Sequence, residues 1–291
     1  MKKSYVYAAI SILLWSTFAT SSKLLLGAFG NYQVLCISSL FAALFLICAV
    51  FVTGRGKLLK KYSIKDYALM ALIGLPGTFF YYVFYYSGAE RLPASLAFTV
   101  NYMWPIMSIV FACIILKERL TLRKCIAIAV SFVGVAIISG GNLFNFDAGI
   151  LWGIIFCLLG AVSYGLFTAL NTKYEYDVFV AMTVNSFAAF ILSFAVIAAK
   201  QELFVPNLTE TLGFLWNGIF VIAIPNSTWI LALNCKNTSK ISNLAYITPF
   251  LSLIWTFFVL GEPINILSVA GLAVIIIGIL IQLKDKKEEL K

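Results

Sequence analysis

Residues 101–105, with the sequence Asn-Tyr-Met-Trp-Pro, lie in the middle of an uncharged, apolar run over residues 92–116. At about 1.5 Å of helical rise per residue, this run is long enough to cross a bilayer core of about 30 Å. Pro105 has no N–H, so the carbonyl one turn upstream loses its helical partner and must face protein or water. The segment therefore predicts either a mid-membrane solute site or a packing kink in which Asn101 bonds a neighbouring helix.

Composition indicates a membrane protein. Of the 291 residues, 62% are hydrophobic and only 11% are charged, whereas a soluble domain carries roughly 25% charged residues. The formal charge of +9 comes from Lys and Arg in short connections between apolar runs, so it does not indicate nucleic-acid binding. The chain has no histidine, and its six cysteines lack paired spacing. We therefore expect a polytopic membrane protein with no metal, no cofactor and no enzymatic activity.

Charged residues divide the chain into ten uncharged intervals, each long enough to span a bilayer as a helix. The expected fold is all-α, with ten transmembrane helices, short connections and no soluble domain. The intervals cover residues 4–22, 24–54, 67–89, 92–116, 125–146, 148–170, 178–199, 211–235, 241–261 and 263–283.

Basic residues predict the orientation. With the N-terminus inside, only Lys23, Arg91 and Lys200 of the 21 Lys and Arg residues fall on the outer side. This bias predicts that both termini are cytoplasmic, which requires an even number of spans and agrees with ten. We expect the protein in the cell's inner (cytoplasmic) membrane, in contact with the lipid bilayer.

The chain repeats itself after a shift of 144 residues. The shift aligns Ser95 with Ser239, Tyr102 with Tyr246, Pro105 with Pro249, Ser108 with Ser252, Leu116 with Leu260 and Glu118 with Glu262. Because each repeat holds five spans, the second copy is inverted relative to the first. We expect two five-helix repeats, residues 1–146 and 147–291, around a central cavity, as in many transporters. A duplication without transport is the alternative.

The motifs resemble a known family. The sequences Leu-Lys-Glu-Arg-Leu at 116–120 and Leu-Gly-Glu-Pro-Ile at 260–264, with the two Tyr-x-x-Pro motifs, are similar to the drug/metabolite transporter superfamily in its EamA-type branch. Residues 14–17, 100–105, 171–174 and 246–249 most resemble the YddG family of aromatic amino acid exporters. This resemblance implies a cavity lined by spans 1, 3, 4, 6, 8 and 9. The unusually aromatic segment 79–86 departs from that family's pattern and bears on the substrate.

Polar and aromatic residues at mid-span depth are the candidate site, because a polar group facing lipid costs several kcal/mol. The expected substrate-binding residues are Trp15, Ser16, Thr17, Thr78, Tyr81, Asn101, Tyr102, Trp104, Tyr164, Asn226, Trp229 and Tyr246. The expected helix-breaking or gating residues are Pro105, Pro249 and Lys23.

Several residues have a second interpretation. Tyr164 and Trp229 suit packing as well as lining, and Lys23 suits either an outer gate or a side chain that extends to the surface. Tyr85 and Tyr86 are expected at the membrane interface. Two glutamates at span ends, Glu118 and Glu262, are expected to bond helix ends or backbone amides.

No Asp or Glu lies inside a span, which disfavours a proton antiporter that relies on a buried carboxylate. A zwitterion fits better: its carboxylate would accept hydrogen bonds from Asn101, Ser16 and Thr17, and its ammonium would rest on carbonyls freed by Pro105 and Pro249 or on a ring face. We expect export or facilitated passage of amino acids with aromatic or apolar side chains, by alternating access. The alternatives are a carrier for organic or quaternary ammonium cations in an aromatic cage, and a membrane enzyme or structural protein. The sequence leaves a homodimer open.

Overall fold

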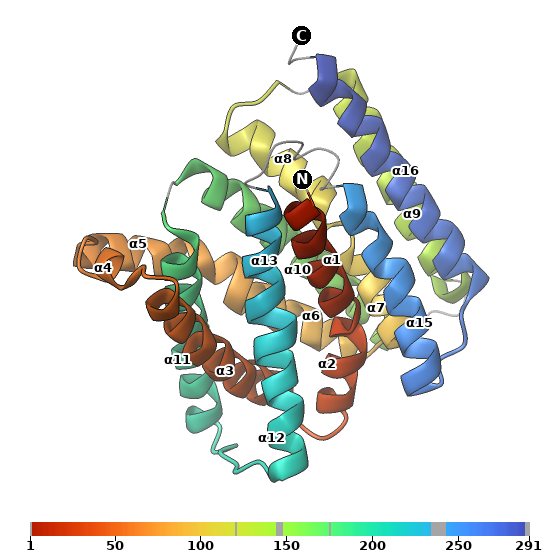
Figure 1. The fold of residues 1–291 in the computed structure, drawn as a ribbon. Coiled ribbons are helices and arrows are strands. Elements are labelled where there is room, and N and C mark those ends of the chain that lie inside the picture. The colour runs from red at the N-terminus through yellow and green to blue at the C-terminus, as the bar shows by residue number, and fades with distance from the viewer. Residues whose placement is uncertain (1, 120, 144–147, 175, 234–242, 289–291) are drawn as a thin grey trace.

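The computed structural model describes residues 2–119, 121–143, 148–174, 176–233 and 243–288. Within these ranges every regular element is a helix, which confirms the all-α class (Figure 1). The described part contains seven helical segments that are long and apolar enough to cross a membrane, so the multi-pass prediction is confirmed. They are Lys3–Leu26, Asn31–Val52, Ile64–Ala89, Ala94–Ile115, Ala148–Lys173, Val178–Ala199 and Leu208–Trp229, and Leu244–Leu260 and Ile266–Ile281 are shorter apolar helices.

The elements follow one another with short connections. The N-terminal part contains α1 (Lys2–Ser16), α2 (Phe18–Leu26), α3 (Asn31–Val52), α4 (Gly56–Leu59), α5 (Ile64–Leu75), the π-helix η1 (Pro76–Phe80), α6 (Tyr81–Ala89), α7 (Ala94–Asn101), α8 (Trp104–Ile115) and α9 (Leu122–Leu143). The C-terminal part contains α10 (Ala148–Lys173), α11 (Val178–Ala199), α12 (Leu208–Leu215), the π-helix η2 (Trp216–Ala223), α13 (Ile224–Leu233), the 3₁₀-helix η3 (Asn243–Ile247), α15 (Thr248–Leu260) and α16 (Ile266–Glu288).

Two spans are interrupted at their prolines. Helix α7 ends at Asn101 and α8 begins at Trp104, so Pro105 occupies the first turn of α8, where an N–H would have no partner within that helix. In the same way, α15 begins at Thr248, directly before Pro249. Both prolines therefore lie in the first turn of an α-helix that follows an interruption of the span.

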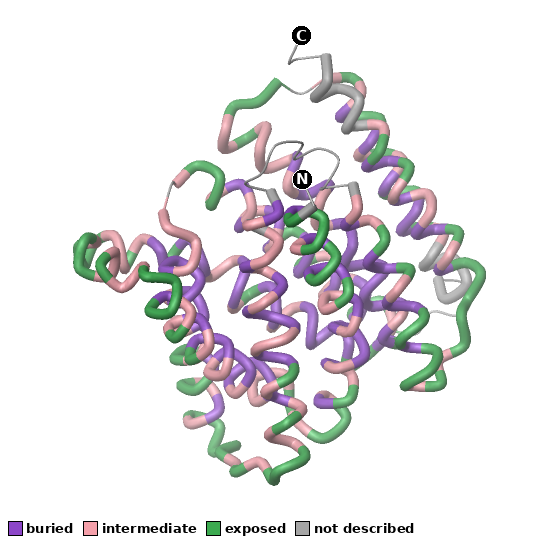
Figure 2. The backbone as a smooth tube through the Cα atoms, viewed as in Figure 1, coloured by how far each residue is buried: buried purple, intermediate pink, exposed green. Residues whose placement is uncertain are grey.

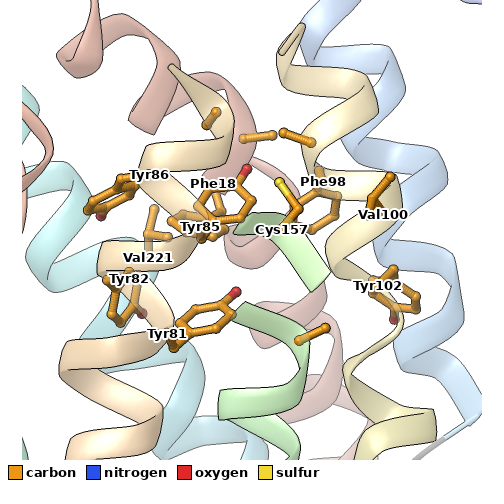
Figure 3. Packing of buried hydrophobic residues seen from close by; sticks show 14 of the residues in the cluster. Phe18, Tyr81, Tyr82, Tyr85, Tyr86, Phe98, Val100, Tyr102, Cys157 and Val221 are labelled. Carbon is orange, nitrogen blue, oxygen red and sulfur yellow. The ribbon is translucent and has the colours of Figure 1, made fainter. Parts of the chain in front are cut away.

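The core is built from aromatic side chains of α6 that surround Phe18 of α2 (Figure 3). The ring of Phe18 stacks on Tyr85 with centroids 4.5 Å apart and meets Tyr82 edge-on at 5.8 Å. Buried residues fill the middle of the bundle, and exposed ones lie mainly on its outer helical faces and connections (Figure 2).

The expectation for Tyr85 and Tyr86 was wrong. Both are fully buried rather than placed at the membrane interface. Asn217 of η2 donates a hydrogen bond from Nδ2 to the Tyr86 hydroxyl at 2.9 Å, so this phenol finds its polar partner inside the bundle. A tyrosine near the end of a span can lie at the membrane interface or inside the bundle. Here both tyrosines pack against Phe18 and are therefore inside.

Candidate functional site

A small inner chamber, with a cavity volume of about 60 Å³, lies where the interrupted helices meet. Its wall is mostly aromatic, and its polar members are tyrosines, two asparagines and one threonine. The lining residues are Trp15, Phe18, Tyr81, Tyr82, Phe98, Asn101, Tyr102, Trp104, Tyr164, Val221, Asn226, Ala245 and Thr248. None of these described lining residues carries a charge, as expected for the site.

A wider vestibule, with a cavity volume of about 400 Å³ and partly open to the surroundings, adjoins the chamber. Four residues, Trp15, Trp104, Tyr164 and Asn226, line both spaces. The vestibule extends between the C-terminal half of α10 and the start of α11, and it is also lined by Phe167, Thr168, Asn171, Thr172, Tyr174, Tyr176, Val178, Ala181, Met182 and Trp229. The chamber and the vestibule are therefore neighbours that share one wall.

Aromatic contacts define the boundary between the two spaces. Tyr164 of α10 lies with its ring centroid 4.8 Å from Tyr81 and 5.1 Å from Trp104. On the opposite wall, Trp15 meets Trp229 at 5.5 Å. For Tyr164 and Trp229, both lining and packing are realised, because each lines a cavity while contacting another ring.

Asn101 lies at the end of α7 and is only 2% exposed. Its Nδ2 donates a hydrogen bond to the Tyr81 hydroxyl at 3.0 Å, whereas its Oδ1 is buried without a hydrogen-bond partner. Beside it is Gly160, where an added Cβ would lie 3.3 Å from this oxygen. A buried, unpaired acceptor is costly, which makes Asn101 the polar centre of the chamber.

Tyr102 joins the two interrupted spans. Its hydroxyl donates a hydrogen bond to the backbone carbonyl of Ala245. Ala245 stands four residues before Pro249, so this is the carbonyl that Pro249 deprives of its helical N–H. Tyr102, at the break before Pro105, thus supplies a hydrogen-bond donor to the Ala245 carbonyl at the break before Pro249.

The second asparagine of the chamber is engaged on both sides. Asn226 donates from Nδ2 to the Ile222 carbonyl at 2.6 Å, and its Oδ1 lies 3.5 Å from the Tyr164 hydroxyl that donates to it. The Thr248 hydroxyl, by contrast, is buried without a hydrogen-bond partner.

Three predicted polar residues do not line the chamber or the vestibule. The Ser16 hydroxyl accepts a hydrogen bond from Trp255 Nε1 at 3.0 Å. Thr17 lines a separate apolar groove, where its hydroxyl accepts from Trp216 Nε1 at 3.2 Å. Each of these hydroxyls also donates to the Leu13 or Leu14 carbonyl of α1.

The third of these residues, Thr78 of η1, donates to the Gly74 carbonyl at 2.9 Å and to the Asn185 carbonyl at 3.3 Å. A hydroxyl that bonds its own helix can face lipid or protein without penalty, so mid-span depth alone does not assign it to a cavity. Tyr246 is half-buried next to the aromatic core but is not on the chamber wall.

The end of the bundle at Lys23 is tied together by charged groups. The half-buried Lys23 donates from Nζ to the backbone carbonyls of Ala89 and of Leu92, the latter at 2.6 Å, so its side chain is held against the connection between α6 and α7. The Glu262 carboxylate accepts hydrogen bonds from the backbone N–H of Ala94, as expected for a structural glutamate. At another connection, Glu118 accepts from Lys124 Nζ at 3.0 Å.

Sequence reasoning missed several wall residues: Phe18, Tyr82, Phe98, Val221, Ala245 and Thr248. Two had a usable signal. Phe18 follows Trp15 by three residues, the spacing that places side chains on one helix face, and Thr248 lies directly before Pro249 in the second Tyr-x-x-Pro motif. The other four are ordinary apolar or aromatic residues whose direction depends on packing.

Comparisons with known proteins agree with this geometry. A model described as the EamA-like transporter family matches residues 2–140 and 151–283. An uncharacterized transporter of Clostridium kluyveri is 27% identical over 99% of this chain and 95% of its own length. An aromatic amino acid exporter, YddG, of Ancylobacter novellus is 24% identical over 83% of each chain. A crystal structure of a protein 20% identical in sequence superposes with a TM-score of 0.71 over 96% of both chains, which shows a shared fold.

Proposed function

The chain belongs to the EamA-like transporter family, a family of membrane transporters, and we propose that it exports or facilitates the passage of amino acids with aromatic or apolar side chains. The observation that carries the proposal is the uncharged chamber at the helix breaks, walled by rings and adjoining a vestibule on one side. The family assignment weighs against the membrane-enzyme and structural-protein alternatives.

We propose that the fold comprises ten spans in two inverted repeats, residues 1–146 and 147–291; their boundary lies outside the described residues. Two features at the 144-residue shift support this. The starts of α8 and α15, Trp104 and Thr248, differ by 144, and η1 shifted by 144 overlaps η2. Corresponding breaks in corresponding spans are expected of a duplicated unit.

The packing of α9 against α16 is reciprocal in the same register. A Cβ added at Gly134 would lie 2.7 Å from both the Gly271 carbonyl oxygen and Ile275 Cγ1. A Cβ added at Gly278 would lie 2.8 Å from the Ala127 carbonyl oxygen. Gly278 corresponds to Gly134 in the 144-residue repeat, and Gly271 corresponds to Ala127. Each contact between the two helices is thus repeated by the residues that correspond to it in the other repeat. Reciprocal contacts of this kind are expected when two elements are related by a two-fold axis. Figure 1 shows these two helices side by side.

The two unequal ends of the chamber support transport by alternating access. At one end, Lys23 and Glu262 hold the connection between α6 and α7 closed. The vestibule lies at the other end, because Trp229, which lines it, packs with Tyr7 and Ala8 near the start of α1. With both termini cytoplasmic, as the basic residues predict, this state is open to the cytoplasm and closed to the outside.

The chamber suits a zwitterion with an apolar side chain. Rings of Trp15, Trp104 and Tyr164 offer stacking surfaces, each aromatic pair adding about 0.5–1.5 kcal/mol beyond burial. Small increments of this kind suit weak binding and release. The YddG exporter among the relatives supports an aromatic side chain.

A carrier for organic or quaternary ammonium cations is the second candidate. The observation that favours it is the same ring-walled chamber, since a cation over a ring face gains about 0.5–2 kcal/mol. A quaternary ammonium has no N–H to donate, so Asn101 would matter little to it.

Purified protein in proteoliposomes distinguishes the two candidates. We expect counterflow of labelled phenylalanine that falls when Trp15 is replaced by Ala and when Asn101 is replaced by Leu. If neither replacement reduces phenylalanine flux while the Trp15 replacement reduces quaternary amine flux, the amino acid proposal is wrong. No flux of either compound above protein-free vesicles would contradict both. Placement in the cytoplasmic membrane and a homodimer remain predictions.

A further inference from the structure

We propose that the site recognises its substrate by the protonated amine at Asn101, and that the substrate's carboxylate is dispensable for binding. The substrate class then extends from aromatic amino acids to primary aromatic amines, and it excludes aromatic acids that lack an amine. This inference rests on the proposed function, because it concerns the same chamber. It reverses the sequence-based expectation that Asn101 donates to the carboxylate.

The first step is the hydrogen-bonding direction of Asn101. A carboxamide has two donors on nitrogen and one acceptor oxygen. The nitrogen already donates to the Tyr81 hydroxyl at 3.0 Å, whereas the oxygen has no partner. One of its two N–H groups is thus engaged and its oxygen is wholly unpaired, so the oxygen is the group of this side chain that most needs a donor from the ligand. An ammonium supplies one and a carboxylate does not.

The second step concerns the other acceptors of the chamber. Pro105 cannot donate to the backbone carbonyl of Asn101, and Pro249 cannot donate to that of Ala245. The Ala245 carbonyl is already engaged by the Tyr102 hydroxyl. Asn101 thus carries both its unpartnered Oδ1 and the backbone carbonyl that Pro105 leaves without a helical donor. Two acceptors on one residue suit the three N–H donors of a primary ammonium.

The third step is the surroundings of Asn101. The ring centroid of Tyr164 lies 4.8 Å from that of Tyr81 and 5.1 Å from that of Trp104, and ring faces attract cations. Gly160 leaves space beside the Asn101 oxygen. An ammonium at this point is therefore stabilised by oxygens and by π-faces together.

The fourth step is the absence of a charged partner for the carboxylate, to which the wall offers only neutral donors such as the unpartnered Thr248 hydroxyl. Among the described residues that line the chamber and the vestibule there is no Lys or Arg. The Asn226 nitrogen, the other amide donor, is engaged by the Ile222 carbonyl at 2.6 Å. A substrate carboxylate would thus remain toward the open vestibule, where water solvates it. Its loss removes little binding.

The test is competition for labelled phenylalanine, both in counterflow with proteoliposomes and in equilibrium binding to the detergent-purified protein. The probes are phenethylamine, which lacks the carboxylate, and 3-phenylpropanoate, which lacks the amine. We expect phenethylamine to compete within about threefold of unlabelled phenylalanine and 3-phenylpropanoate at least about tenfold more weakly, a difference equivalent to one or two charge-assisted hydrogen bonds. Equal or stronger competition by the acid overturns the inference.

Two variants tie the preference to Asn101. N101L is expected to erase the difference between phenethylamine and 3-phenylpropanoate. Y81F removes the acceptor that orients the Asn101 amide, so the amide is free to turn, and competition by the acid is expected to rise at least about threefold. The matched control is Y5F, which removes the hydroxyl of an exposed tyrosine on α1 and is expected to leave the ratio unchanged. If N101L does not fold, Y81F alone decides: an unchanged ratio refutes the role of Asn101.

The inference and the proposed function fail separately. Phenylalanine flux with preferred competition by the acid overturns amine recognition and leaves transport intact. Amine-selective binding to the purified protein without flux in vesicles supports amine recognition and contradicts transport.

Discussion

Glu262 accepts two hydrogen bonds from Ser95 on its Oε2 oxygen, one from the backbone N–H at 2.9 Å and one from the hydroxyl at 2.7 Å. Its other oxygen accepts from the Ala94 N–H at 2.6 Å. The carboxylate thus lies on the first turn of α7, where free N–H groups and the helix dipole favour negative charge. Lys23 holds the Leu92 carbonyl just before this turn. Two oppositely charged residues, Lys23 of α2 and Glu262 of the connection between α15 and α16, therefore hold one short connection.

The first prediction is that E262A loosens this end of the chamber. The reporter is a cysteine in place of Val221, a buried chamber residue, in protein whose six native cysteines are replaced. We expect a membrane-impermeant maleimide added from the Lys23 side to label V221C about five- to fiftyfold faster in E262A, because charge-assisted hydrogen bonds contribute about 1.5–3 kcal/mol each.

The control for E262A is E202A, which removes another glutamate whose side chain is exposed. Its labelling rate should equal that of the parent protein. If E262A labels no faster than E202A, Glu262 does not hold the chamber closed.

The second prediction concerns Tyr102, whose hydroxyl occupies the Ala245 carbonyl. In Y102F this buried carbonyl loses the Tyr102 hydroxyl, the donor that replaces the N–H missing at Pro249. The unpaired carbonyl should destabilise the conformation seen in the structure by about 1–3 kcal/mol. We expect the equilibrium to shift away from this state, so that V221C becomes more accessible from the Lys23 side. If V221C is as accessible in Y102F as in the parent protein, the hydrogen bond from Tyr102 to the Ala245 carbonyl does not favour one conformation over the other.

The third prediction separates the ring of Tyr164 from its hydroxyl. The ring contacts Tyr81 and Trp104, whereas the hydroxyl makes one long contact of 3.5 Å with Asn226. Y164F should change the KM for phenylalanine less than about threefold, and Y164A should raise it about five- to thirtyfold, since aromatic pairs and ring burial together carry 1–2 kcal/mol. The reverse order, with Y164F the more damaging variant, would assign recognition to the hydroxyl.

Much of the fold could be predicted because it follows from local chemistry. A proline has no N–H in any environment, so Pro105 and Pro249 predict the helix breaks before any packing is known. Uncharged intervals of sufficient length predict spans because a lipid core excludes charge. The wall residues next to the breaks, Asn101 and Trp104, were predicted for the same reason.

The direction of each mid-span side chain could not be predicted in the same way. Ser16 and Thr78 are as polar as Asn101, yet their hydroxyls bond carbonyls of their own helices and leave them free to face any side. The side chain of an asparagine has two N–H donors and an acceptor oxygen, and bonds to its own helix cannot pair all of them. The burial of Tyr85 depends on Phe18, a contact between two spans that no pattern within one span reveals.

The fourth prediction tests the close approach of α8 to α10, which positions Trp104 against Tyr164. A Cβ added at Gly165 would lie 2.5 Å from Met107 Cβ and 2.7 Å from the Met107 carbonyl carbon, distances at which backbone must move. G165A should therefore destabilise the protein by about 1–3 kcal/mol through overpacking and lower its thermal unfolding midpoint in detergent.

The matched variant is G27A. Gly27 has a helical φ of −68°, and its added Cβ would meet the Leu24 carbonyl oxygen at an ordinary 3.4 Å. Alanine is therefore accommodated there, and the lower entropy of its unfolded chain should leave the midpoint equal or slightly higher. Because Gly165 follows Tyr164 directly, G165A should also weaken phenylalanine counterflow, whereas G27A should not. A midpoint for G165A at or above that of G27A would show that α8 and α10 separate without cost, and the contact between Trp104 and Tyr164 would then have no rigid support.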